Sequence, residues 1–167
     1  MNLYLMRHAI AEKRDSSQYP DDSQRPLSIP GRRKMTKIAD GLKELGLGFD
    51  LILSSPYLRA RETAEIMAKR FGLKNHLVFT DHLSPLGHAD QLIAEILEQR
   101  MVEHLLLVGH EPNMSSLASM LLAGNGSVQI TMKKGGLCCL STADLRYAQC
   151  AALEYLLTPG QMVAMVQ

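Results

Sequence analysis

The feature that most restricts the fold is an alternation of short apolar runs with longer segments of helical periodicity. Largely apolar runs occupy residues 3–6, 49–55 and 104–108, and their length suits strands better than helices. Between and after them, apolar side chains recur every three or four residues, as on the buried face of a helix. This order predicts an α/β fold in which helices cover both faces of a mostly parallel sheet, a three-layer α/β/α sandwich.

Local signals set the expected boundaries of these elements. We expect Gly46 to end the first helix, and Ser55 to cap a second helix whose first residue is Pro56. Strands at 135–141 and 149–157 should be joined by a turn. The residues predicted to face the core from four helices are Met35, Ile38, Ala39, Leu42 and Leu45; Ala60, Ala64, Met67 and Phe71; Leu92, Ile93, Ile96 and Leu97; and Leu117, Ala118, Leu121 and Leu122.

Chain length and charge argue against several classes of protein. A chain of 167 residues suits a single domain over residues 1–167. The formal net charge of +1 argues against nucleic-acid binding, which usually needs a strong basic excess. No apolar run approaches the roughly 18 residues of a membrane span, and Arg7 interrupts the first run too early for a signal peptide. We expect a cytoplasmic monomer with free thiols at Cys138, Cys139 and Cys150.

Basic and imidazole side chains follow three of the predicted strands. The first run ends in Arg7 and His8, and the run at 104–108 leads through a glycine to His110. Arg59 lies just beyond the run at 49–55. Ligands of open α/β sheets bind beyond the carboxyl ends of the strands, so these side chains should share one rim. Such a cluster at helix N-termini suits a phosphoryl group, and no carboxylate needs to lie among its members.

Simpler interpretations exist for each of these residues taken alone. A histidine at a strand end is more often a hydrogen-bonded structural residue, and an arginine on a helix is more often solvated. Two histidines could also bind zinc. However, Arg7 beside His8 would repel a cation, and no Asp or Cys stands at ligand spacing. We therefore expect neither a metal site nor a cofactor.

Three motifs resemble those of the histidine phosphatase superfamily, and most closely its SixA-type phosphohistidine phosphatases. They are LMRHA at 5–9, SSPYLRARETA at 54–64 and LLLVGHEPNMSSLA at 105–118; RPLSIPG at 25–31 also matches. The third residue of the superfamily's usual Arg-His-Gly triplet is Ala9 here. The resemblance implies a phosphoglycerate mutase-like fold and no requirement for metal.

The resemblance also implies a role for each matching residue. His8 matches the nucleophile, which takes the phosphoryl group onto an imidazole nitrogen. Arg7, Arg59 and His110 match the rest of the phosphate pocket, and Arg25 matches a more variable arginine near it. The residue types agree with this chemistry, because a neutral imidazole is a good nucleophile and arginine can grip two phosphoryl oxygens at once. His110, if protonated, would add a third cationic donor.

The absence of a glutamate that could act as general acid indicates which kind of substrate to expect. Mutases and phosphomonoesterases of the superfamily carry a glutamate after the third strand, as general acid for the leaving oxygen. The corresponding segment, 81–91, has Asp81 and Asp90 at its edges but no glutamate. An alkoxide needs that proton, whereas phosphohistidine expels an imidazole that can already carry its own. The segment is also short, and an uncovered rim suits a phosphate presented on another protein.

We therefore expect a metal-independent phosphatase of protein phosphohistidine, with a histidine phosphotransfer domain as the partner that the family suggests. Two alternatives stay open. A phosphatase of small phosphoesters would be favoured if Asp81 or Asp90 acts as an acid. A regulator that holds phosphohistidine without turnover would have no need of the nucleophile at His8.

Overall fold

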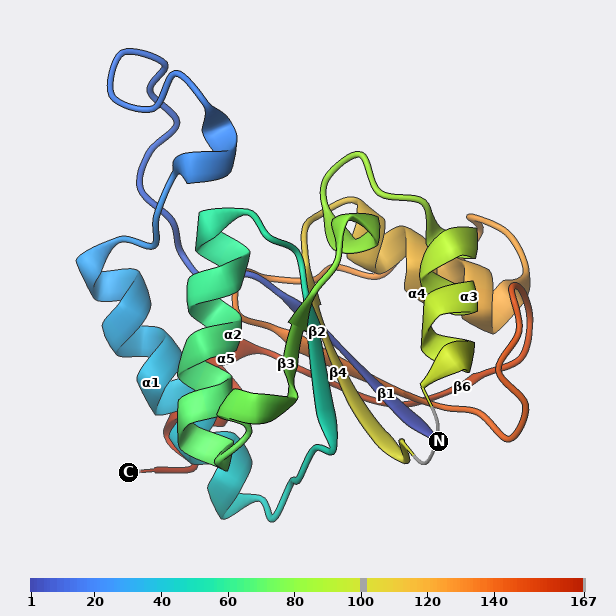
Figure 1. The fold of residues 1–167 in the computed structure, drawn as a ribbon. Coiled ribbons are helices and arrows are strands. Elements are labelled where there is room, and N and C mark those ends of the chain that lie inside the picture. The colour runs from blue at the N-terminus through green and yellow to red at the C-terminus, as the bar shows by residue number, and fades with distance from the viewer. Residues whose placement is uncertain (100–101, 167) are drawn as a thin grey trace.

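The computed structural model describes residues 1–99 and 102–166 (Figure 1). Its strands are β1 (Asn2–Arg7), β2 (Leu51–Ser54), β3 (Leu77–Phe79), β4 (His104–Gly109), β5 (Leu137–Ser141) and β6 (Ala152–Leu157). Its helices are α1 (Ile29–Glu44), α2 (Leu58–Phe71), α3 (Ala89–Glu98), α4 (Asn113–Ala123) and α5 (Pro159–Ala164), with short 3₁₀ helices η1 (Asp22–Gln24), η2 (Lys74–His76) and η3 (Asp81–Leu83). None of these described helices is long and apolar enough to cross a bilayer.

One six-stranded sheet runs through the molecule in the order β3-β2-β4-β1-β5-β6. The first four strands in this order are parallel, and β5 and β6 are antiparallel to their neighbours. β1 lies inside the sheet between β4 and β5, although it is the first strand of the chain. The prediction of a mostly parallel sheet is confirmed, and the two antiparallel strands are the late pair that the sequence places around a turn.

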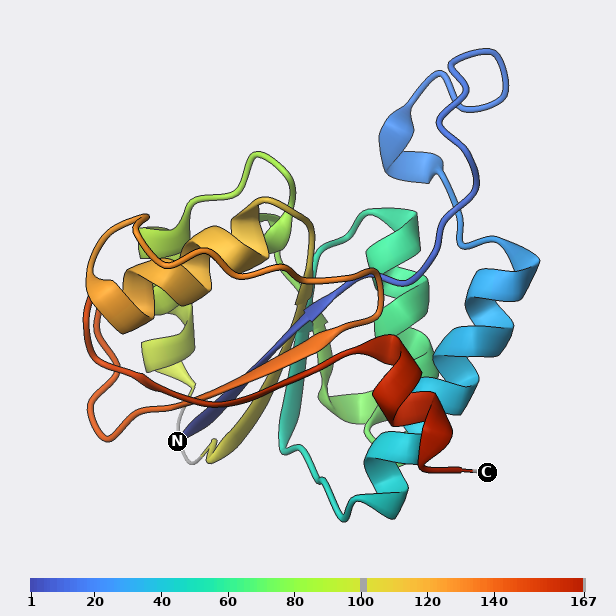
Figure 2. The same cartoon turned by 180° about the vertical axis from the view of Figure 1, so that it is seen from behind.

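Helices cover both faces of the sheet, as Figures 1 and 2 show for α1, α2 and α5 on one side and α3 and α4 on the other. β1 illustrates why its sequence is apolar throughout. Leu3 and Leu5 pack with the buried residues of α3 and α4, while Tyr4 and Met6 pack with those of α1, α2 and α5. Complete burial of such a side chain stabilises a fold by roughly 1.5–3 kcal/mol. The three-layer α/β/α sandwich is therefore confirmed.

The start of α1 follows from the RPLSIPG segment. Ser28 caps the helix, because its Oγ accepts the N–H of Gly31 at 3.1 Å. Gly31 packs against the chain after β1 so closely that a Cβ there would lie 1.9 Å from the carbonyl oxygen of Ile10. The segment thus fixes the helix start against the loop that follows the predicted nucleophile.

Two of the predicted core residues are wrong. Leu45 is 44% exposed and Leu97 is 59% exposed. Leu45 lies just past the end of α1, where Gly46 adopts a positive φ of 75° and turns the chain away. Leu97 follows the buried Ile96 by one residue, and the 100° step between neighbouring helix residues carries it to the outer face of α3.

Candidate active site

β1 and β4 are neighbours that end at the same edge of the sheet. They are parallel, with Arg7 opposite Gly109, and the N–H of His8 donates to the Gly109 carbonyl at 2.9 Å. His8 and His110 therefore leave adjacent strands together, and their ring centroids are 5.1 Å apart. β2 lies on the other side of β4, and Arg59 is the second residue of the helix that follows it. This topology explains why two distant apolar runs each end on a histidine.

An open cleft of about 500 Å³ lies at this edge. It is bordered on one side by a segment that projects beyond the sheet (Figure 1), here called the arm and defined as residues 12–26. All five residues that the sequence analysis singled out line the cleft, namely Arg7, His8, Arg25, Arg59 and His110. The other lining residues are Arg14, Asp21, Asp22, Ser23, Tyr57, Pro85, Glu111 and Lys134.

The hydrogen bonding of His8 fixes which ring nitrogen is available. Nδ1 lies 2.7 Å from the carbonyl oxygen of Ala9, which can only accept, so Nδ1 carries the proton and Nε2 carries a lone pair. The Ala9 peptide is itself anchored, because its N–H donates to Thr63 Oγ1 at 3.0 Å. Burial, together with the charges of Arg59 and Arg7, outweighs the Ala9 hydrogen bond and lowers the pKa of His8 to about 3. The imidazole is therefore neutral and nucleophilic at physiological pH.

His110 is held by a short turn before α2. Ser55 Oγ accepts the N–H of Tyr57 at 3.2 Å and lies 2.9 Å from His110 Nε2. In the tautomer whose Nε2 accepts the remaining hydrogen of this hydroxyl, the ring proton lies on Nδ1. That nitrogen is buried and has no hydrogen-bond partner among the described residues. Burial, followed by the charges of His8 and Arg59, lowers the pKa of His110 to about 3, so in the free protein it is neutral and not a third cation.

The prediction that Ser55 caps the second helix is wrong. α2 begins at Leu58, and the preceding Tyr57 gives it no side-chain cap. Pro56 lies in the turn before the helix and not within it. The hydroxyl of Ser55 is instead taken up by the turn and by His110, so this serine supports the site.

Arg7 and Arg59 are each anchored by their terminal nitrogens. Arg7 Nη1 donates to the carbonyl of Met132 at 2.9 Å. Arg59 is 4% exposed, and its Nη1 and Nη2 contact Asp22. Nε of each arginine is buried and has no partner among the described residues. With Nδ1 of His110 in that tautomer, three buried donors without a partner belong to residues that line one cleft, and a phosphoryl group could satisfy such donors.

Asp22 is a charged residue of the cleft that the sequence did not reveal. No carboxylate was expected among the cations, yet Asp22 lies between Arg25 and Arg59. Partial burial would raise the pKa of its carboxyl, but the hydrogen bond from Arg25 and the charges of Arg59, Arg25 and Arg14 outweigh that effect and lower the pKa. The spacing of Asp22 and Arg25, three residues apart in a polar loop, was the only local signal for the pair.

The remaining carboxylates are engaged in other contacts or lie outside the cleft. Asp21 caps η1, and the two carboxylate oxygens of Glu111 accept the N–H and the hydroxyl of Ser115. Asp81 and Asp90 are exposed and lie outside the cleft lining. In the part of the chain that the structure describes, no three His, Cys, Asp or Glu side chains gather as a metal site.

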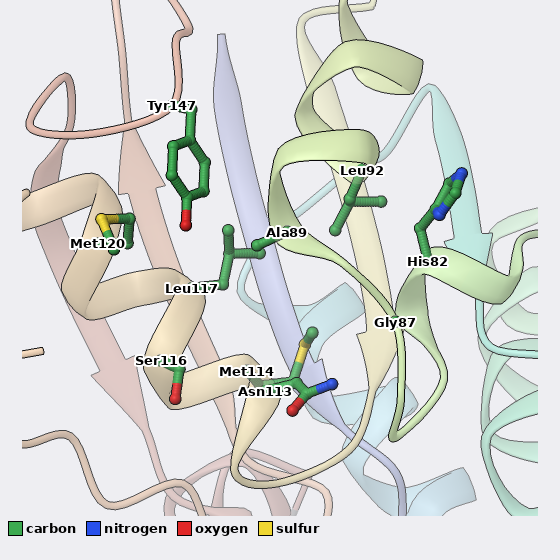
Figure 3. A pocket seen from close by; sticks show the side chains of 10 residues that line it. All are labelled: His82, Gly87, Ala89, Leu92, Asn113, Met114, Ser116, Leu117, Met120 and Tyr147. Atoms are coloured by element: carbon green, nitrogen blue, oxygen red, sulfur yellow. The ribbon is translucent and has the colours of Figure 1, made fainter. Parts of the chain in front are cut away.

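A second hollow, of about 210 Å³, lies between α3 and α4 (Figure 3). Its floor includes the buried Leu92, Met114 and Leu117, and Tyr147 lies at its rim. His82 is the one imidazole among its lining residues, which include no lysine or arginine. This hollow therefore lacks the arginine donors that suit a phosphoryl group and that line the cleft at the strand ends.

The sequence matches the histidine phosphatase superfamily (branch 1) over residues 3–84. It is 31% identical over 130 residues to the phosphohistidine phosphatase SixA homolog of Haemophilus influenzae, covering 72% of this chain and 77% of that protein. It is also 36% identical over 148 residues to an uncharacterized protein of Picosynechococcus, covering 87% and 88% of the two chains. The solved structure of the protein histidine phosphatase SixA complexed with tungstate superposes with a TM-score of 0.79 at 22% identity, covering 96% of this chain and 98% of that one.

Proposed function

The chain belongs to the histidine phosphatase superfamily, in its SixA-type branch, and is a phosphatase of that type; we propose that its substrate is phosphohistidine on a second protein. In this proposal His8 is the nucleophile, and Arg7, Arg59 and His110 bind the phosphoryl group. The observation that supports it most is the set of three unpartnered donors beside an imidazole whose Nε2 is free.

The first step would transfer the phosphoryl group between two imidazoles. The lone pair on His8 Nε2 attacks phosphorus, and the bond from phosphorus to the substrate imidazole breaks. Because the Ala9 carbonyl keeps a proton on Nδ1, the phosphorylated ring is a protonated phosphoramidate. Water then attacks phosphorus, and His8 leaves as a neutral imidazole without needing an external acid.

The donors of the cleft would stabilise the transferring group. In a loose transition state the negative charge is spread over three equatorial oxygens, and catalysis depends on positioning and charge stabilisation. Arg7 and Arg59 each carry a buried Nε–H without a partner among the described residues, and His110 carries an Nδ1–H in the tautomer described above. Since these groups are already oriented, little reorganisation is required when the charge develops.

The leaving group separates phosphohistidine from ordinary phosphoesters. Each cleft carboxylate has partners elsewhere: Asp22 is ion-paired with Arg59, Glu111 accepts from Ser115, and Asp21 caps η1. An imidazole can leave with the proton that it already carries, whereas an alkoxide cannot. The segment between β3 and α3 contributes only Pro85 to the lining, which supports a substrate presented on another protein.

A leaving-group series tests this proposal. Rates would be measured for phosphohistidine proteins, including a phosphorylated histidine phosphotransfer domain, for phosphoramidate, and for aryl and alkyl phosphates of graded leaving-group pKa. General acid catalysis is typically worth about 10²–10⁴-fold, so alkyl phosphates should lag behind phosphohistidine by a factor of that size. A steep negative slope of log rate against leaving-group pKa is expected.

A flat slope would instead show that a proton reaches the leaving atom, and would favour a phosphatase of small phosphoesters. Stoichiometric retention of phosphohistidine without phosphate release would favour a binding regulator. His8→Ala is the matched control for all substrates, because hydrolysis by this variant would not pass through the proposed nucleophile.

A further inference from the structure

One carboxylate joins the arm to the cations of the cleft. Asp22 Oδ1 accepts from Arg25 Nε at 2.9 Å, and Asp22 Oδ2 lies 3.1 Å from Arg59 Nη2. The main-chain carbonyl of Asp22 also accepts from Arg59 Nη1 at 2.8 Å. Asp22 therefore holds both terminal nitrogens of an arginine that is 37 residues away in sequence.

These contacts leave a defined edge of Arg59 unoccupied. A guanidinium binds planar or tetrahedral oxyanions through pairs of N–H groups, along either its terminal edge or its Nε edge. Asp22 takes the terminal edge, and the buried Nε has no partner among the described residues. Nε is thus the guanidinium nitrogen that these contacts leave for a phosphoryl oxygen.

We propose that Asp22 is a positioning residue, which fixes the Arg59 guanidinium so that its Nε edge faces the phosphoryl group. This proposal rests on the phosphoryl-binding role proposed above for Arg59. The carboxylate does not touch the reacting atoms; it acts through the arginine. Its own position is set by the arm, where Asp21 caps η1 and Arg25 Nη1 donates to the carbonyl of Glu12 at 2.8 Å.

The burial of Arg59 makes a counter-ion necessary. Its side chain is 5% exposed, whereas that of Asp22 is 32% exposed. Burial lowers the pKa of Arg59, and the charge of Asp22 opposes that shift. Without this carboxylate Arg59 Nη2 would lose its contact with Oδ2, and only the main-chain carbonyl of Asp22 would still accept from Arg59 Nη1. A misplacement of about 1 Å in a reacting geometry can cost about 10²-fold in rate.

Three variants test this role. Asp22→Ala removes the side-chain contacts, Asp22→Asn keeps an acceptor but removes the charge, and Asp15→Ala is the matched control. Asp15 also accepts hydrogen bonds within the arm, from Ser17 at 2.9 and 2.6 Å, but it does not line the cleft. The measurements are kcat and KM with phosphoramidate, affinities for orthovanadate and inorganic phosphate by calorimetry, and thermal unfolding.

Asp22→Ala should lower kcat by about 10–10²-fold and weaken orthovanadate binding by a similar factor, because vanadate mimics the geometry of the transition state. Affinity for inorganic phosphate should change by less than about threefold. Removing the negative charge of Asp22 removes a repulsion of the phosphate anion, and this gain offsets the loss of the aligned arginine. Asp22→Asn should lose less kcat and less orthovanadate affinity than Asp22→Ala. Asp15→Ala should match the wild type in both quantities.

Unchanged kcat and vanadate affinity in a folded Asp22→Ala protein would overturn the proposal. A lower KM with unchanged kcat would also overturn it, because Asp22 would then be a competitor of the phosphoryl group. Vanadate affinity keeps the test separate from the proposed function: if the wild type hydrolyses no phosphohistidine, the substrate assignment fails, but weaker vanadate binding by Asp22→Ala would still support the positioning role.

Discussion

Lowering the pH from 7 to 5 should destabilise the folded chain through two buried imidazoles. His8 and His110 are 7% and 2% exposed, and burial is the main cause that lowers the pKa of each to about 3. In an unfolded chain a histidine titrates near pH 6.5, to within about half a unit. The unfolded state therefore binds more protons between these values. The stabilising contribution is complete above pH 6.5 and is lost as the pH falls toward 3.

The size of the effect follows from the two pKa values. Each histidine should lower the free energy of unfolding by about 1.4 kcal/mol for each pH unit well below 6.5, or about 2 kcal/mol between pH 7 and pH 5. The two together give about 4 kcal/mol, which is a large part of the 5–15 kcal/mol that typically stabilises a domain, on the order of a third or more. Asp22, whose pKa is lowered, loses its contribution only at more acidic pH.

Urea denaturation at pH 7, 6 and 5 would measure this loss, in buffers without phosphate because a bound anion would stabilise the cleft. The double variant His8→Gln/His110→Gln should lose about 4 kcal/mol less than the wild type over this range. The exposed His88 provides the control, since His88→Gln should follow the wild type. Equal pH slopes for the wild type and the double variant would refute the assignment of neutral, buried imidazoles.

Three further predictions concern the cleft and the packing of the helices. Replacing Arg7, Arg59 or His110 singly with Ala should lower kcat by about 10²-fold to 10³-fold, and thermal unfolding measured alongside would show whether each loss is merely a loss of folding. Prolonged dialysis against a chelator should leave activity unchanged, and a loss restored by one specific metal would contradict the proposed mechanism. Gly41→Ala should destabilise the fold by about 1–3 kcal/mol in urea titrations, because the added Cβ would lie 1.9 Å from a carbonyl oxygen of α5. Gly160→Ala is the control; an added Cβ there meets open space, so this variant should be neutral or slightly stabilising.

The sequence was informative about the site because the relevant geometry belongs to the backbone. Strands that are parallel neighbours must end at a common edge, so residues directly after apolar runs could be placed together without knowing any side-chain contact. His8 and His110 are such residues. The helical faces could be predicted for the same reason, because a regular backbone repeats its environment. Leu45 lies just past the end of α1, where that repetition stops, and Leu97 lies on the outer face of the last turn of α3.

The features that the sequence did not reveal are tertiary contacts of irregular segments. Asp22 lies in the polar arm, where no periodicity marks an inward side chain, and its main partner Arg59 is distant in the chain. The local sequence predicted that the hydroxyl of Ser55 caps a helix, but in the structure this hydroxyl contacts His110 instead. The neutral state of both histidines depends on burial, which follows from how the helices and the arm pack and not from neighbouring residues.

The most direct test of the proposed mechanism is to trap the phosphoryl group on the enzyme. The protein would be mixed with an excess of a radiolabelled phosphohistidine protein, quenched in alkali within milliseconds and mapped by peptide analysis. The mechanism predicts label on His8, bound through Nε2, stable to alkali and labile to acid, and absent from His8→Ala. Rapid release of phosphate without label on His8, or turnover by His8→Ala close to that of the wild type, would contradict it.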